Sequence, residues 1–233
     1  MKQRFWELDA LRGFTILLMI AVHLLYDLIY IFRVLDNGPS AFHFLREWGG
    51  IIFLVLSGIC VTLGSRPIKR GLIVFACGLI INVVTYFMYY LGYAQRDIVI
   101  YFGVLHLLGS AMMLWPLLKK CPSYVLFAIG VLIIAGGFYL LNNVRAQSYL
   151  LIPFGIQPRR FLTSDYFPLL PYLGFFLLGS VLGRIVYRKK KSLLPAWNEK
   201  SYLLRFACLC GRNSLWIYML HQPVLYLILL LIL

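Results

Sequence analysis

Long apolar runs alternate with short polar segments along the whole chain. Seven runs stand out, at about residues 14–32, 49–65, 71–91, 98–118, 123–141, 167–187 and 211–233. A membrane-spanning helix needs about 20 mostly apolar residues. The pattern therefore predicts an all-α, polytopic membrane bundle of about seven transmembrane helices. No segment between the runs is long enough for a soluble domain, so we expect one integral-membrane domain over residues 1–233.

Composition supports this prediction. Of 233 residues, 62% are hydrophobic and only 13% are charged, and the mean hydropathy is +0.85. Soluble domains are usually about 45–50% apolar, so a soluble enzyme, a disordered chain and a disulfide-stapled secreted module are excluded. The five cysteines have neither a metal-ligand nor a disulfide-framework spacing. We therefore interpret them as small buried hydrophobic residues and expect no metal.

The basic residues are distributed unevenly among the predicted connections. Lys and Arg number 22 against 8 Asp and Glu, which gives a net charge of +14. If the N-terminus is cytoplasmic, 16 of the 22 basic residues lie in inner segments, including the Arg188–Lys191 run. The positive-inside rule then predicts a cytoplasmic N-terminus and an outside C-terminus. The charge thus reflects topology and an anionic leaflet surface, and we expect no nucleic-acid partner.

Titratable residues within the first run predict a functional site, because such groups are costly in a membrane. Arg12 and His23 are eleven positions apart and share a helix face. Asp27 follows His23 by four positions, the spacing at which helix side chains meet. A neutral imidazole supported by a carboxylate can remove a proton from a hydroxyl or an amine. The same spacing also allows a structural alternative, in which both side chains only join helices through hydrogen bonds.

Other polar residues in or near the runs are weaker candidates. In the last run, Ser214, Tyr218 and His221 fall on one face, and Pro223 frees a backbone carbonyl. A cavity or a packed kink would both explain this pattern. The residues that we predict to line a cavity are His106, Ser214, Tyr218, His221 and Gln222.

Two connections carry further candidates. Arg66, Lys69 and Arg70 follow the second run, and they suit either plain topology or a phosphate-binding mouth shared with Arg12. The outer segment 142–166 is long and partly apolar, which predicts packing as a re-entrant or interfacial piece rather than disorder.

Five stretches resemble a known family. Residues 7–14 contain Asp-x-x-Arg-Gly and precede His23, which resembles the opening of the transmembrane acyltransferase superfamily, including acyltransferase family 3. Over the whole chain, the resemblance is to the bacterial branch of the heparan-α-glucosaminide N-acetyltransferase-like family. The matching stretches after the first are residues 53–58, 102–106, 168–174 and 211–223.

The resemblance implies an enzyme that takes an acyl group, usually acetyl, from cytoplasmic acyl-CoA. It passes this group to a hydroxyl or amine of a saccharide on the other side of the membrane. Arg12 would contact the CoA phosphates and His23 would be the base. In the animal lysosomal relatives the key histidine follows the first helix, a region represented here by His43 in the first outer loop. His43 is therefore the second candidate, although it also suits an ordinary interfacial histidine.

We predict an acetyl-CoA- or acyl-CoA-dependent O- or N-acyltransferase of the bacterial plasma membrane that modifies a cell-envelope glycan or glycolipid. Arg12, Arg66, Lys69 and Arg70 would bind the donor, and the predicted cavity residues would line the path of the substrates. Additional contacts with the acceptor are expected from Arg159, Arg160 and Asp165.

The animal relatives have more helices, so this chain would take a smaller acceptor, work as a homo-oligomer or lack activity. A transporter or flippase using the same buried residues is the competing class, although no paired acidic relay or inverted repeat is evident. An accessory membrane subunit is the third.

Overall fold

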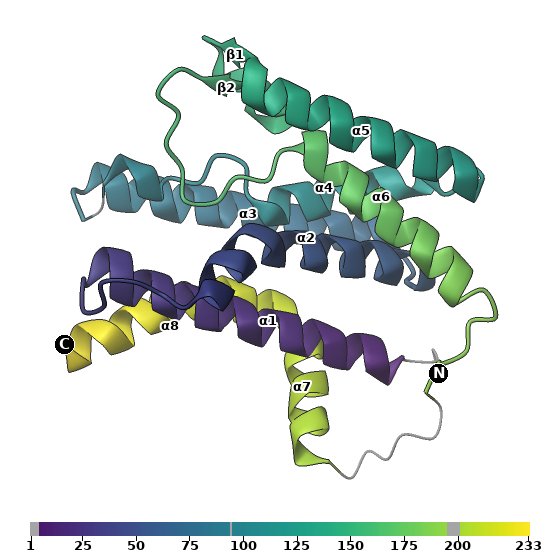
Figure 1. Ribbon diagram of the computed structural model, residues 1–233, viewed down its shortest axis with the longest axis horizontal. Coiled ribbons are helices and arrows are strands. Elements are labelled where there is room, and N and C mark those ends of the chain that lie inside the picture. Colours follow the sequence, from purple (N-terminus) through teal and green to yellow (C-terminus); the bar gives the residue numbers. More distant parts are fainter. Residues whose placement is uncertain (1–4, 94, 195–200) are drawn as a thin grey trace. The chain divides into compact units, whose positions relative to one another are not determined.

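The computed structural model describes residues 5–93, 95–194 and 201–233, and most of these residues are helical (Figure 1). These residues group into two compact units. The first unit contains residues up to Leu56 and from Lys189 onwards, and the second contains Ser57–Arg188. The helices of the first unit are α1 (Trp6–Tyr26), the π-helical turn η1 (Asp27–Ile31), most of α2 (Ser40–Leu63), α7 (Tyr202–Arg212) and α8 (Ser214–Ile232).

The second unit contains the end of α2 and four further long helices. These are α3 (Pro67–Tyr90), α4 (Val104–Leu118), α5 (Ser123–Asn143) and α6 (Leu169–Val186). Its connections contain two short 3-10 helices, η2 (Arg96–Ile98) and η3 (Tyr149–Phe154), and the two-residue strands β1 (Arg145–Ala146) and β2 (Gln157–Pro158).

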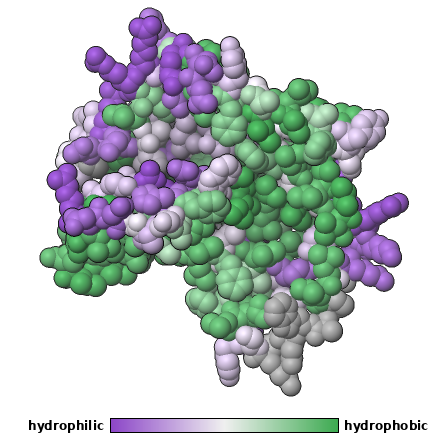
Figure 2. Space-filling model, viewed as in Figure 1, coloured by the Kyte–Doolittle hydropathy of each residue, from purple (hydrophilic) through white to green (hydrophobic). Residues whose placement is uncertain are grey.

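Six helices in the described ranges are long and apolar enough to cross a membrane. They are Trp6–Ile31, Ser40–Leu63, Pro67–Tyr90, Ser123–Asn143, Leu169–Val186 and Ser214–Ile232. The remaining predicted span, 98–118, is helical only over Val104–Leu118, which rises about 22 Å against a hydrocarbon core of about 30 Å. Hydrophobic residues cover much of the face seen in Figure 2. The all-α polytopic class is confirmed, and the count of seven spans stays a prediction.

Several predicted boundaries were wrong. The first helix begins at Trp6, not near residue 14, and α2 begins at Ser40, not at residue 49. Arg46 and Glu47 interrupt the apolar run, but both residue types favour helix, so they do not interrupt the helix itself. His43 therefore lies in the first turn of α2 and not in an outer loop.

The first and last spans run in the same direction. Three residue pairs join the first span, made of α1 and η1, to the C-terminal helices α7 and α8. They are Asp9 with Arg212, His23 with His221, and Asp27 with Gln222, and the residue numbers rise together in both segments. Figure 1 shows α1 and α8 with parallel courses. Two spans with the same direction fit the predicted odd number of crossings.

Small residues bring the helices of the second unit close together. Gly71 of α3 lies against the backbone carbonyl of Gly109 in α4, and Gly174 of α6 lies against that of Gly130 in α5. Close backbone approach at glycine is typical of membrane helix pairs. The second unit is thus built from two tight pairs, α3 with α4 and α5 with α6.

The segment between α5 and α6 is packed, as its apolar content predicts. Strand β1 pairs with β2 in parallel, and Ile152 of η3 is only 3% exposed. The Tyr166 hydroxyl donates to the Ile152 carbonyl at 2.8 Å. Burial raises the pKa of the Tyr166 phenol, so it remains a donor at ordinary pH.

Candidate active site

The hydrogen bond of the His23 imidazole determines where its proton lies. Nδ1 of His23 is 2.9 Å from the backbone carbonyl oxygen of Met19, one turn earlier on α1. A carbonyl oxygen only accepts, so Nδ1 must carry the hydrogen. In the neutral ring Nε2 is then an unprotonated lone pair, which is the state that a general base requires. The side chain is half-buried.

A second imidazole lies beside the first in the same tautomer. The His221 ring of α8 packs edge-on against that of His23, with 4.7 Å between ring centroids. Nδ1 of His221 is 2.7 Å from the Tyr218 carbonyl. Its Nε2 atom is buried and has no hydrogen-bond partner among the described residues. α1 and α8 thus bring together two imidazoles that both leave Nε2 unprotonated.

The carboxylate of Asp27 is held by α8. Asp27 opens the π-helical turn η1, is 0% exposed, and accepts from Gln222 Nε2 at 2.8 and 3.0 Å. Segments of π-helix occur frequently at functional sites. Gln222 therefore positions a buried carboxylate, a role that the sequence did not predict.

No hydrogen bond joins His23 to Asp27 among the described residues. Among the described residues the Asp27 carboxylate accepts from Gln222, and the His23 ring turns back towards Met19. Met19 lies four positions before His23 and Asp27 four positions after it. A single ring nitrogen therefore cannot form a hydrogen bond with both residues. Asp27 therefore lies one helical turn from His23, and its carboxylate is bonded to α8 instead.

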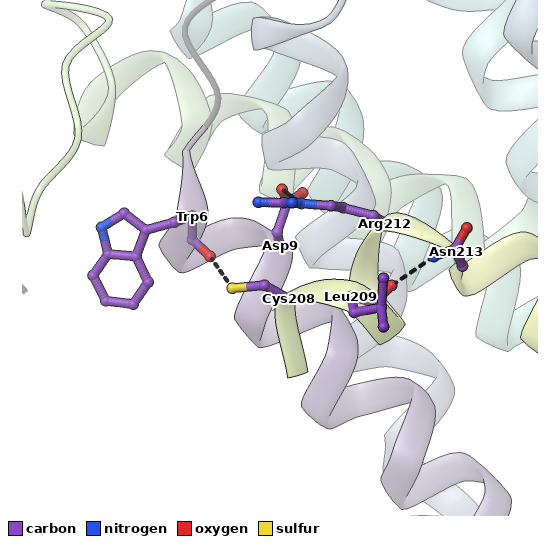
Figure 3. A network of polar contacts seen from close by, with 6 residues as sticks. All are labelled: Trp6, Asp9, Cys208, Leu209, Arg212 and Asn213. Carbon is purple, nitrogen blue, oxygen red and sulfur yellow. Dashed lines mark hydrogen bonds and ion pairs between the residues drawn. The ribbon is translucent and has the colours of Figure 1, made fainter. Parts of the chain in front are cut away.

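Two motifs about 200 residues apart interlock where α1 begins (Figure 3). Arg212 donates from Nε to the Asp9 carboxylate at 3.2 Å. A Cβ on Gly13 would collide with the Ala207 carbonyl, and one on Gly211 with the Asp9 carbonyl. Asp9 and Gly13 of the Asp-x-x-Arg-Gly motif therefore seat α7 on α1.

Arg12 is the residue of this motif that packing does not explain. Its guanidinium makes no hydrogen bond or ion pair with any residue that the structure describes, and the side chain is partly exposed. The nearby carboxylate of Asp9 is occupied by Arg212. Arg12 is thus free to bind an anionic group of a ligand. In the sequence, Arg212 was counted among the basic residues of the inner segments, and its pairing with Asp9 was not predicted.

His43 has ordinary surroundings. It is exposed in the first turn of α2, and its Nε2 lies 3.2 Å from the Asn37 side-chain oxygen. Its ring also packs edge-on against Phe42. The described residues show no contact between His43 and His23.

The remaining histidine of the apolar runs, His106, lies in the second unit and has the opposite tautomer. It is 2% exposed, and the backbone N–H of Gly103 donates to its Nδ1 at 3.2 Å. The neutral ring therefore carries its hydrogen on Nε2. That N–H has no partner among the described residues, with Phe75 and Gly78 of α3 packed against the ring. An unpaired buried donor is costly, and an oxygen atom of a ligand would satisfy it.

The three predicted acceptor contacts of the outer segment differ in their surroundings. Asp165 accepts from the backbone N–H of Val104 at 3.1 Å, and a carboxylate at this helix start stabilises α4. Its position thus has a structural explanation. Arg159 and Arg160 are exposed just after β2, and their contact with an acceptor stays a prediction.

The predicted phosphate-binding cluster lies where α3 begins. Arg66, Lys69 and Arg70 are exposed, and Arg66 adopts a left-handed backbone conformation before Pro67. Cations in a first helical turn oppose the helix dipole, so these three do not stabilise α3 by charge. A bound anion would offset that repulsion. Arg12 belongs to the other unit, so a mouth shared with it stays a prediction.

Comparison with known proteins identifies the family. A model described as heparan-α-glucosaminide N-acetyltransferase, catalytic, matches residues 4–223. No curated protein and no solved structure matches the chain. The match covers nearly the whole chain, including His23, His221 and both interlocked motifs. The chain therefore belongs to the heparan-α-glucosaminide N-acetyltransferase catalytic family, a family of acetyltransferases.

Proposed function

We propose that this protein is a membrane-bound acyltransferase. It moves an acyl group, usually acetyl, from cytoplasmic acyl-CoA to a hydroxyl or amine of an extracytoplasmic saccharide or glycolipid. Family membership supports the reaction class. The observation that carries the assignment of the base is the hydrogen bond from His23 Nδ1 to the Met19 carbonyl, which leaves Nε2 as a proton acceptor.

The proposed reaction uses His23 first as a base and then as an acid. Nε2 takes the proton of the acceptor hydroxyl or amine while the acceptor oxygen or nitrogen attacks the thioester carbonyl carbon. The bond between that carbon and sulfur then breaks. The CoA thiolate leaves and receives the proton from the imidazolium, which returns His23 to its neutral form.

The neighbours of His23 support this cycle. The imidazolium carries a positive charge, and the buried Asp27 carboxylate one turn away offsets that charge. Gln222 keeps the carboxylate in place through two contacts. The His221 ring lies beside His23 and has the same tautomer, so its Nε2 lone pair offers a second acceptor for the proton.

Donor and acceptor would be bound by Arg12, by the basic cluster at the start of α3 and by His106. Arg12 has no partner among the described residues and suits a CoA phosphate. The exposed Arg66, Lys69 and Arg70 are further candidates for that role. The buried Nε2–H of His106 suits an oxygen of a substrate. Family membership favours transfer over the transporter alternative, and the bacterial plasma membrane remains the proposed location.

The test uses purified full-length protein in bilayers, labelled acetyl-CoA and an envelope-lipid extract. We expect a labelled lipid or glycan product with the wild type and none with His23→Ala. The matched control is His43→Ala, which removes an exposed histidine of the same unit and should retain activity. A loss confined to His43→Ala would assign the base to His43. Full activity of His23→Ala would contradict the mechanism.

A further inference from the structure

Helix α7 has an apolar face that no described helix covers. Tyr202, Phe206 and Leu209 are 86%, 54% and 57% exposed. They follow each other by four and three positions, so they form one stripe along the helix. The other side of α7 is packed against α1 through Ala207 and Gly211. An exposed apolar stripe of this kind usually marks a surface that contacts a protein or a membrane.

The position of α7 favours contact with a membrane over contact with a protein. α7 contacts α1 near its first turns, at Asp9 and Gly13, and extends away across the direction of α1 and α8 (Figure 1). With 11 residues it is about 16 Å long, too short to span a bilayer. A short amphipathic helix at the end of a span is placed to lie along the lipid–water interface.

The same end of α1 is positively charged. The buried Glu7 carboxylate accepts from Ser192 Oγ at 2.9 Å and from the Leu193 backbone N–H at 3.1 Å. These bonds tie the segment that follows the exposed run Lys189–Lys191 to the start of α1. Glu7 is engaged with Ser192 and Leu193, and Asp9 pairs with Arg212, so neither carboxylate is free to neutralise the lysine run.

We propose that α7 is an interfacial helix that binds anionic phospholipid in the leaflet at the amino-terminal end of α1. The stripe of Tyr202, Phe206 and Leu209 lies among the acyl chains, while Lys189–Lys191 contact the phosphate headgroups. A phospholipid supplies both parts of this chemistry, an apolar chain and a negative charge. This site is independent of the proposed acyl transfer.

The experiment places a photoreactive side chain in the stripe by the substitution Phe206→p-benzoylphenylalanine. The full-length protein is reconstituted in nanodiscs of equal parts phosphatidylglycerol and phosphatidylcholine and illuminated. The adducts are then identified by mass spectrometry. We expect lipid adducts in which phosphatidylglycerol exceeds phosphatidylcholine by at least about five-fold, since a single basic residue near a surface already gives roughly that preference.

A second set of variants tests the contribution of charge at the same probe position. Lys189→Gln, Lys190→Gln and Lys191→Gln together should bring the two lipids to nearly equal adduct yields. The matched control is Lys119→Gln with Lys120→Gln, two exposed lysines of the second unit, which should leave the five-fold preference unchanged. Size-exclusion chromatography checks that each variant is folded. Adducts to a second copy of the chain, an absence of lipid adducts, or equal yields in the wild type would each overturn the proposal.

Discussion

In the first unit, the imidazoles of His23 and His221 each donate Nδ1–H to a carbonyl of the preceding turn of their own helix. In the second unit, the imidazole of His106 accepts a backbone N–H on Nδ1. The first arrangement leaves an unprotonated Nε2, and the second leaves an Nε2–H. Three histidines that all come from apolar runs are therefore suited to different chemistry, proton removal in one unit and hydrogen-bond donation in the other.

This difference is created by the backbone and not by burial alone. All three rings are tied to main-chain groups within four residues of themselves. His106 lies at the start of α4, where backbone N–H groups lack helical partners, so its ring meets a donor. His23 and His221 lie within their helices, where the nearest free lone pairs belong to carbonyl oxygens. Position along a helix thus selects which nitrogen remains reactive.

The largest expected effect comes from placing glutamine at each histidine. Glutamine keeps a donor and an acceptor but cannot take up a proton near neutral pH. His23→Gln should lower the rate of acetyl transfer by about 10²- to 10⁴-fold, the usual contribution of a general base. His106→Gln should remain near the wild-type rate, because the amide can replace the lost Nε2–H. Initial rates with labelled acetyl-CoA compare the two variants. Equal losses would contradict the different roles assigned to His23 and His106.

The Asp27–Gln222 pair should be the most sensitive structural feature of the first unit. Gln222→Leu leaves a fully buried carboxylate without its donor. We expect a loss of about 3–5 kcal/mol in the free energy of unfolding, as for other buried charges that lose their partner. Adding Asp27→Leu should restore most of that stability. Unfolding of the protein in detergent measures both variants, and a stable Gln222→Leu protein would contradict the pairing.

Much of the fold follows from hydropathy, whereas the interlocking of the site does not. The seven apolar runs identify α1 to α6 and α8, because burial in lipid needs about 20 apolar residues in sequence. Helix α7 was missed because its 11 residues alternate between packed and exposed sides and include Arg205 and Arg212. Spacing along α1 identified His23 and Asp27 as candidates, but it could not identify the hydrogen-bond partner of the Asp27 carboxylate. Gln222, 195 residues away, is brought to Asp27 only by the packing of α8.

The α1–α7 contact predicts a smaller loss of stability. Gly13→Ala would place a methyl group against the Ala207 carbonyl, which should cost about 1–3 kcal/mol in the free energy of unfolding. Gly136→Ala in α5 is the matched control, because a Cβ at Gly136 meets nothing within 4 Å. Thermal unfolding should separate the two variants by several degrees. Equal unfolding temperatures would show that α7 is not seated on α1 in this way.

The smallest effect is expected when the donor of the second unit is removed. His106→Phe keeps the ring volume beside Phe75 and Gly78 but loses the Nε2–H. A neutral hydrogen bond contributes about 0.5–1.5 kcal/mol, so transfer should fall by only about 3- to 10-fold. Titration of the acceptor should assign this loss to KM rather than to kcat. A loss as large as that of His23→Gln would make His106 part of the proton-transfer chemistry.

The central claim, that proton removal belongs to His23 and donation to His106, is tested most directly by ¹⁵N solid-state NMR. Histidine-labelled protein in bilayers at neutral pH would be compared with His23→Gln and His106→Gln to assign the signals. We predict a protonated Nδ1 and a bare Nε2 for His23, and the reverse for His106. A hydrogen on Nε2 of neutral His23 would contradict the account.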